Sequence, residues 1–135
     1  MRHASVLMWR VFGKDFGHLM EFLNEEGLPA AIISPRRFGQ VLQFDVQGIA
    51  SQAHVHRNTV TRAPASPALQ NFLKESLQVL RAAVDVSGSV EKAIYWFRNE
   101  PLQAFDYKTA QDLVTEKRSA AVIKYLQSLQ AGFAG

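Results

Sequence analysis

Cysteine is absent from this sequence of 135 residues. Its absence excludes disulfide bonds, thiolate nucleophiles, and zinc or iron–sulfur sites built on cysteine. Long apolar runs are also absent, because the longest, Ser5-Val6-Leu7-Met8-Trp9, is broken at Arg10. It is far shorter than the ~20 residues that span a bilayer, and no small-residue cleavage site follows it. We therefore expect a cytoplasmic protein without membrane association.

Charged residues are few, at 20% of the chain, whereas apolar residues make up 47%. This balance is enough to bury a core and excludes disorder for most of the chain. The formal net charge is +3, and the excess is concentrated in one segment. Residues 34–66 hold four arginines and one acid, whereas residues 67–135 hold eight basic and seven acidic residues. A local basic excess of this kind favours an anionic partner.

No arrangement of residues typical of catalysis is present. There is no glycine-rich phosphate loop, no HExxH string and no serine with an evident His–Asp pair. His54 and His56 have no third ligand at metal-binding spacing, so an ordinary pair at a turn is expected. Asp112 and Glu116 lie at a predicted helix start, where the helix dipole favours acids anyway. We expect no enzyme, no metal and no cofactor.

Apolar spacing and capping signals predict an all-α fold. The last predicted helix ends at Gly132, and residues 1–13 are ambiguous between a strand and the entry to a helix. We expect them to form an arm that packs on the domain or on a second copy. The expected helices before the turn at Pro64 cover residues 15–26 with Gly27 as the stop, a segment opened by Ser34-Pro35, residues 46–53 and residues 56–62. The later ones are a long segment opened by Ser66-Pro67, a helix capped by Ser89 that runs through Phe97 and ends before Pro101, a short segment opened by a Thr109–Asp112 capping box, and residues 119–130.

Pro64 and Pro67 bracket a turn that is the expected domain boundary. The chain is then divided into an N-terminal arm and helix (1–27), a central domain (28–66) and a C-terminal domain (67–135). No internal repeat or low-complexity tract is present.

The central domain carries a helix-turn-helix pattern in the most basic part of the chain. Ala50 supplies the small residue at the helix crossing, and Ile49 and Val60 supply buried positions. The string Ile49-Ala50, His54-Val55 and Thr59-Val60-Thr61-Arg62 resembles the helix-turn-helix of small bacterial regulators of the Xre type. His54 stands where that pattern has glycine, and histidine is among the better tolerated residues at positive φ. The alternative is a solvated basic face on an ordinary three-helix core.

If the motif is genuine, its second helix presents polar side chains outward. Arg57 and Asn58 would reach base edges, since arginine suits guanine and asparagine suits adenine. Arg36, Arg37 and Arg62 would contact phosphates. The full set of candidate DNA-binding residues is Arg36, Arg37, His56, Arg57, Asn58, Thr61 and Arg62.

The C-terminal half carries a second pattern, in which a tryptophan, a proline and a terminal glycine stand at fixed relative positions. The pattern consists of Ala93, Trp96, Pro101, Phe105, Thr109, Leu113, Val122, Leu126 and Gly132. It resembles the toxin-binding domain of the Xre/MbcA/ParS family of bacterial antitoxins. The chain departs from that family's pattern at Ala110, where proline is frequent, and at Lys117-Arg118, where glycine is frequent. The aromatic residues Trp96, Phe97 and Phe105 are expected in the core.

This resemblance covers residues 28–135 and implies an all-α protein with a helix-turn-helix bundle followed by a small helical toxin-binding domain. It implies an antitoxin of a type II system that neutralises a cognate toxin, most often a RES-type toxin that degrades NAD⁺, by blocking its active site. It also implies a homodimer, a larger toxin–antitoxin complex, and binding to operator DNA. The alternative is a stand-alone transcriptional regulator whose C-terminal half only dimerises.

The expected toxin-binding residues lie at the end of the chain. Gly132 is predicted to end the helix in a left-handed turn and to free a tail that plugs the toxin's pocket. The alternative is that Phe133 folds back on Leu129. Lys124 and Gln127 are the polar candidates on the preceding helix, and the full set is Lys124, Gln127, Gly132, Phe133, Ala134 and Gly135.

Overall fold

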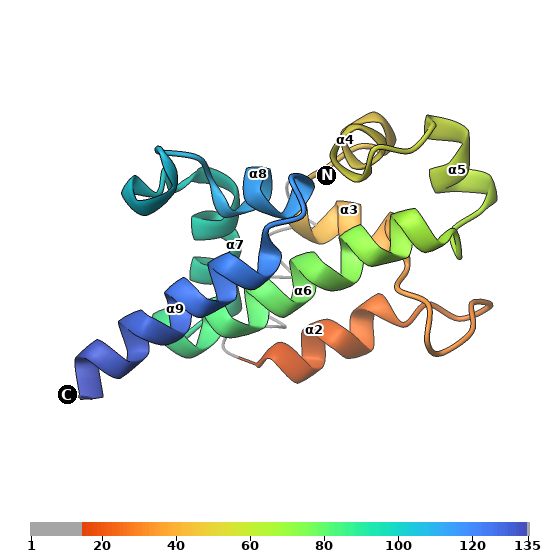
Figure 1. Cartoon of the computed structure of the whole chain (residues 1–135). Coiled ribbons are helices and arrows are strands. Elements are labelled where there is room, and N and C mark those ends of the chain that lie inside the picture. Colours follow the sequence, from red (N-terminus) through yellow and green to blue (C-terminus); the bar gives the residue numbers. More distant parts are fainter. Residues whose placement is uncertain (1–14, 135) are drawn as a thin grey trace.

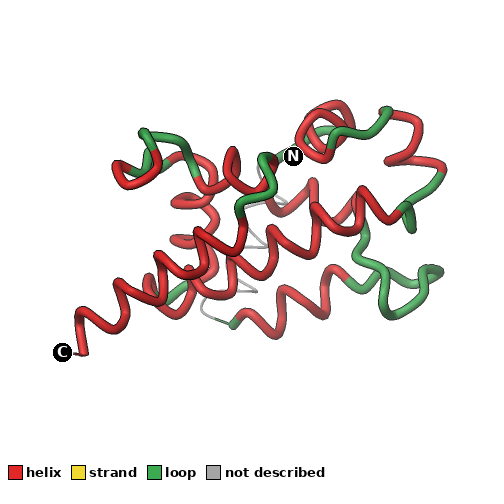
Figure 2. The backbone as a smooth tube through the Cα atoms, in the orientation of Figure 1, coloured by secondary structure: helices red, strands yellow, loops and turns green. Residues whose placement is uncertain are grey.

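The computed structural model describes residues 15–134, and this part of the chain consists of helices joined by loops, of which the longest, residues 24–34, joins the first two helices (Figures 1 and 2). It holds eight α-helices and one short 3-10 helix. Within these residues there is no strand, and one isolated bridge pairs Leu102 with Lys108. The predicted all-α fold class is confirmed. The predicted arm of residues 1–13 lies outside the described residues.

Four short helices precede one long helix, and shorter elements follow it before the final helix. In Figure 1, α6 runs through the middle of the molecule, with α2 along one side and α9 along another. None of the described helices is long and apolar enough to cross a membrane. The bounds are α2 (Phe16–Leu23), α3 (Pro35–Leu42), α4 (Val46–Ala53), α5 (Arg57–Arg62), α6 (Pro67–Ser87), α7 (Val90–Asn99), η1 (Gln103–Phe105), α8 (Ala110–Thr115) and α9 (Ser119–Ala134).

The predicted helix starts are confirmed, most of them with their caps. The Ser34 hydroxyl accepts a hydrogen bond from the backbone N–H of Arg37, with Pro35 at the first helical position. The Ser89 hydroxyl caps α7, and Thr109 with Asp112 forms the predicted capping box of α8. Ser66 also precedes its helix, but its hydroxyl makes no capping hydrogen bond. Proline therefore marks the start of α6 without help from the serine side chain.

Two predicted helix ends are wrong. Helix α2 ends at Leu23 instead of residue 26, because Asn24 caps it and the Glu25 side chain bonds to the start of α3. Gly27 adopts a φ of 91° in the turn beyond, so it does not stop the helix. Helix α7 runs through Phe97 to Asn99 and ends before Pro101, as predicted.

The second error concerns α9, which continues through Gly132 to Ala134. The predicted left-handed turn at Gly132 is absent, and its Cβ position faces open space. Glycine costs only about 1 kcal/mol relative to alanine inside a helix. Alanine has the highest helix propensity, and Ala131 and Ala134 lie within two residues of Gly132. The predicted free tail is therefore helical as far as Ala134.

The core is centred on α6 and joins residues from every described α-helix. Phe38 of α3 lies edge-on to Phe72 of α6, with ring centroids 6.1 Å apart, and stacks with Phe44 at 6.4 Å. Helices α6 and α9 run in the same direction. Ser119 donates a hydrogen bond to Glu75 near one end of this pair, and Gln130 donates to the Asp85 carbonyl near the other. Of the aromatic residues expected in the core, Phe97 is fully buried, whereas Trp96 and Phe105 are half-buried against it.

Gln70 is a polar residue buried in the first turn of α6. Its Oε1 accepts a hydrogen bond from the Ile33 backbone N–H at 2.9 Å. Its Nε2 donates to the backbone carbonyls of Ile33 and Pro64, each at 2.8 Å. One side chain thus satisfies three backbone groups from two separate loops, and each would otherwise lose its partner in the interior.

We expect Gln70→Ala to lower the free energy of unfolding by about 2–4 kcal/mol, because buried backbone groups left unpaired cost about 1–3 kcal/mol each and some regain water. Asn71→Ala is the matched control, since Asn71 is the exposed neighbour on the same helix. Urea unfolding of the two variants measures the difference. Equal small losses in both would contradict this role for Gln70.

Candidate nucleic-acid interface

Helices α4 and α5 form a tight pair. The Asp45 side chain caps α4 by accepting a hydrogen bond from the Gly48 N–H at 2.7 Å. Ala50 is 1% exposed, and its small side chain permits close approach of the two helices. Ile49 and Val60 are buried beside it, as predicted. The predicted burial of Ile49 and Val60 and the predicted small residue at the helix crossing are confirmed.

The turn between these helices depends on a left-handed residue. His54 has a φ of 56° and a ψ of 43°, so the histidine adopts the conformation that the motif usually gives to glycine. The N–H of Val55 donates back to the Ala50 carbonyl at 3.0 Å, which fixes the reversal. The prediction that His54 can replace glycine here is confirmed.

The outward face of α5 carries the predicted polar set. His56 caps the helix through Nδ1, which accepts the Asn58 N–H at 3.2 Å. The side chains of Arg57 and Arg62 make no ion pair within residues 15–134. The exposed residues on this face are His56, Arg57, Asn58, Thr61 and Arg62. Two free guanidinium groups and one amide therefore face solvent on a single short helix.

The two arginines at the start of α3 have a different environment. Arg36 forms an ion pair with Glu25 at 2.7 Å. Arg37 donates a hydrogen bond to the Phe22 carbonyl at 2.9 Å, and its guanidinium carbon lies 4.9 Å from the centre of the Phe22 ring. No local pattern in the sequence indicates these partners, which lie 11 and 15 positions away. Both arginines hold the α2–α3 connection in place, so any phosphate contact competes with these structural contacts.

The Glu25 carboxylate organises the start of α3. One of its oxygens accepts a hydrogen bond from the Ser34 hydroxyl at 2.5 Å, and the other accepts one from Arg36. The Ser34 hydroxyl and then the Arg36 guanidinium lower the pKa of Glu25 below its ordinary value. Ser34 is buried and also caps α3, so the carboxylate, the hydroxyl and the helix terminus form one network.

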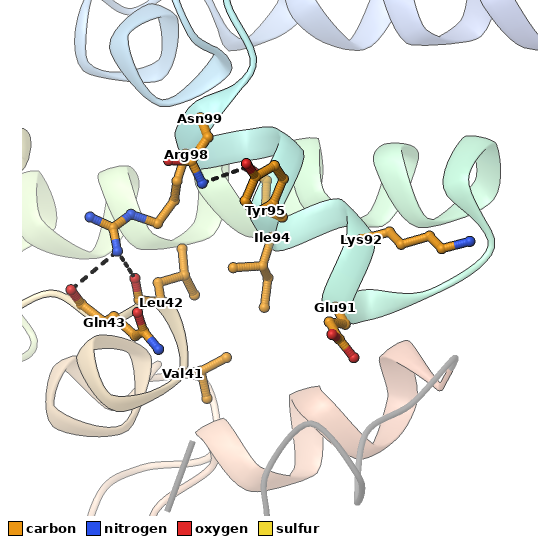
Figure 3. A pocket seen from close by; sticks show the side chains of 9 residues that line it. All are labelled: Val41, Leu42, Gln43, Glu91, Lys92, Ile94, Tyr95, Arg98 and Asn99. Atoms are coloured by element: carbon orange, nitrogen blue, oxygen red, sulfur yellow. Dashed lines mark hydrogen bonds between the residues drawn. The ribbon is translucent and has the colours of Figure 1, made fainter. Parts of the chain in front are cut away.

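Arg98 is a further structural cation that sequence reasoning missed. Its guanidinium donates to the carbonyls of Leu42 at 2.6 Å and Gln43 at 3.2 Å (Figure 3). The guanidinium carbon also lies 4.4 Å from the centre of the Phe44 ring. Burial lowers the pKa of Arg98. A hollow of about 380 Å³ lies beside it, bordered by Tyr95. Arg98 and Asn99, which border this hollow, donate hydrogen bonds to backbone carbonyls and so serve the fold.

The predicted toxin-binding residues lie on or beyond the last helix. Lys124 and Gln127 are exposed on α9, and Gly132 is exposed within it. Phe133 and Ala134 belong to the same helix, and Gly135 lies outside the described residues. The structure thus gathers Lys124, Gln127 and Gly132 on one helix, well separated along the chain from the candidate DNA-binding set.

The Glu25 network predicts a pH dependence of stability. The pKa of Glu25 in the folded chain lies below its ordinary value of 4.5, so its ionised form stabilises the fold above that pH. This contribution is lost as the pH falls from 4.5 through the lower folded value. We expect Glu25→Gln to flatten the fall in unfolding free energy over this range, measured by urea unfolding at stepped pH.

Glu26→Gln is the matched control, because it removes a carboxylate of the same loop that makes none of these hydrogen bonds. If Glu25→Gln loses stability on acidification as steeply as the parent chain, the network does not stabilise the fold through its charge.

The candidate interface thus consists of a capped α4, a left-handed turn and an exposed polar face on α5. Comparison with known proteins adds nothing to this description, since no family model, no curated protein and no solved structure matches the chain.

Proposed function

We propose that this chain is a cytoplasmic antitoxin that binds operator DNA through α4 and α5 and binds a cognate toxin through its C-terminal half. The observation that carries the DNA-binding part is the α4–turn–α5 unit. His54 adopts the left-handed conformation that such a turn needs, and the polar residues of α5 are exposed together. This combination supports a helix-turn-helix over a merely solvated basic face.

The position of each side chain on α5 suggests its role. Arg57 and Asn58 lie at the N-terminal end of α5, which enters the major groove in helix-turn-helix proteins. Arginine pairs with guanine and asparagine with adenine at base edges, whereas Arg62 at the far end suits a phosphate. One such unit reads a half-site, so the proposal includes a homodimer on a two-fold operator.

The toxin-binding part depends on the resemblance of the C-terminal half to Xre/MbcA/ParS-type antitoxins. The exposed side of α9 supports it, because Lys124 and Gln127 offer polar contacts that no described residue of the chain occupies. The last turn of α9, in place of a free tail, would then block the active site of the toxin. The proposed toxin is of the RES type, which degrades NAD⁺, and binding would assemble a larger complex.

Contacts between the two halves of the chain support the proposal that DNA binding and toxin binding are coupled in one protein. Thr115, at the end of α8, donates a hydrogen bond to Gln52 of α4 at 2.5 Å. The Thr115 carbonyl lies 3.3 Å from Nε2 of His54 in the turn. The helix-turn-helix therefore rests directly on the part of the chain assigned to toxin binding.

DNA binding is tested with duplexes selected from a random library by the parent chain. We expect Arg57→Ala to relax the preference at one base pair in each half-site by roughly 1–3 kcal/mol. Arg36→Ala is the control, because its ion pair with Glu25 leaves it no base to read, and any loss should be uniform across sequences. Equal, uniform losses in both variants would contradict the placement of α5.

Toxin binding is tested by deleting residues 132–135, which removes the last turn of α9. The described side chains at this end are exposed, so the fold should persist, as circular dichroism would show. We expect the truncated chain to fail to protect cells that co-express the toxin found beside its gene.

Two further variants locate the docking face. Lys124→Glu on α9 should weaken protection, whereas Lys74→Glu, an exposed lysine on α6, is the matched control. Full protection by the truncated chain would exclude inhibition through the end of α9. If no neighbouring protein co-purifies with the chain from its own cells, the protein is a stand-alone regulator instead.

A further inference from the structure

An open apolar groove of about 1010 Å³ lies beside the helix-turn-helix. The loop of residues 25–28, helix α3, the start of α4 and the end of α5 all line it, in the half of the molecule remote from the C-terminus (Figure 1). Its apolar lining includes Leu28, Phe44, Val46, Ile49 and Val60. Sites for small organic molecules measure roughly 300–1,000 Å³ and combine an apolar lining with a few polar groups, so such a molecule fits a groove of this size.

The apolar lining is more than the outer surface of the core. Phe44 and Val46 pack against the core, whereas Leu28 lies outside it and is still half-buried. The Leu28 side chain therefore lines the groove without serving the core. Apolar surface of this kind gains free energy when another apolar group covers it, at about 25 cal/mol per Å².

The fold holds the groove in shape. Ser34 and Pro64 both line it. The buried amide of Gln70 bonds to the Pro64 carbonyl and to both backbone groups of Ile33, the residue before this serine. The Ser34 hydroxyl is itself fixed, because it donates to the Glu25 carboxylate in the loop that borders the groove. The groove is therefore formed before any ligand arrives, and binding does not have to order its lining.

The charge of the groove is opposite in sign to that of the whole chain. Three carboxylates line it, those of Glu25, Glu26 and Asp45, whereas Arg36 is the one cation in the lining and is paired with Glu25. The Glu26 side chain makes no ion pair or hydrogen bond within residues 15–134. Asp45 uses one oxygen to cap α4, and the other has no hydrogen-bond partner among the described residues. The lining is thus net negative in a chain whose formal net charge is +3.

The proposed function gives no reason for this charge. Val60 and Thr61 of α5 line the groove, so its carboxylates lie close to the helix that is proposed to face DNA. Phosphates repel carboxylates, so DNA binding alone favours neutral or basic side chains here. An occupant with a positive group on an apolar body instead complements both features of the groove, the unpaired carboxylates and the apolar lining.

We propose that this groove binds a small organic cation, a primary amine or quaternary ammonium carried on an extended apolar body. The apolar body covers Leu28, Phe44 and Val46, and the positive group lies at the carboxylates of Glu26 and Asp45. An inorganic cation would leave the apolar lining exposed, and the carboxylates would repel an apolar anion. Binding requires no DNA, so this site is tested separately from the function proposed above.

Dansylcadaverine is a suitable probe, because it carries an ammonium on an apolar chain and its emission shifts to the blue in an apolar site. Dansylaminohexanoate has the same fluorophore and a chain of equal length but ends in a carboxylate, so it is the matched control. In titrations at pH 7 we expect the parent chain to bind the cation roughly tenfold more tightly than the anion. Equal binding of the two probes, or no binding of either below about 1 mM, would overturn the proposal.

Variants of the two carboxylates locate the positive group. Glu26→Gln removes an exposed carboxylate without a described partner, and Asp45→Asn keeps a good helix cap. Each is expected to weaken dansylcadaverine binding by roughly threefold, and the double variant to abolish its preference over the anion. Glu91→Gln is the matched control, because Glu91 is an exposed carboxylate beside the other hollow, next to Arg98. A preference that survives the double variant, or is lost in Glu91→Gln, contradicts the proposal.

The apolar body is located independently. Leu28→Gln should weaken binding of both probes by roughly tenfold. Leu129→Gln should leave both unchanged, since Leu129 is 37% exposed on α9, outside the groove. In methyl NMR spectra, dansylcadaverine should shift the signals of Leu28, Val46 and Val60 and leave those of Ile94 in place. Shifts centred on Ile94 would assign the probe to the other hollow and overturn the proposal.

Discussion

The buried amide of Gln70 fixes the helix-turn-helix relative to the rest of the fold. The three backbone groups that it satisfies belong to Ile33, just before α3, and Pro64, just after α5. The segment from α3 to α5 is therefore closed at both ends by one side chain that belongs to α6. Without the amide, each of these buried groups would lose its partner, at a cost of about 1–3 kcal/mol. The direction in which α5 faces solvent depends on this contact.

Two other contacts hold the same segment from the C-terminal half. Arg98 of α7 binds the carbonyls at the end of α3, and Thr115 of α8 binds α4 close to the turn. Each joins residues more than fifty positions apart in the chain. A helix end leaves carbonyl groups without intrahelical partners, and the guanidinium of Arg98 satisfies those of α3. The two halves of the protein are thus joined by polar contacts as well as by the core around α6.

The elements that sequence predicts well are those fixed by local chemistry. Ser34, Ser89 and the Thr109–Asp112 pair act within three residues of themselves, and the left-handed His54 follows from its place between two short helices. Gln70 bonds to a residue 37 positions away, which no local pattern indicates. The predicted helix end at Gly132 is wrong for a local reason, because glycine disfavours a helix only weakly and the alanines near it favour one. The groove beside α5 requires three non-local segments at once, so composition could not reveal it.

The same kind of non-local contact reduces the number of arginines in residues 34–66 that are available to an anionic partner. Counted along the sequence, residues 34–66 hold four arginines on what looks like one basic surface. In the fold, Arg36 and Arg37 are held by Glu25 and Phe22, and only Arg57 and Arg62 remain without such partners among the described residues. For the proposed DNA binding, two such cations would neutralise few phosphates, so we expect weak non-specific affinity from one copy and a shallow salt dependence. Under that proposal, useful affinity would need base contacts from α5 or a second copy on the same duplex, and a two-fold operator would supply both.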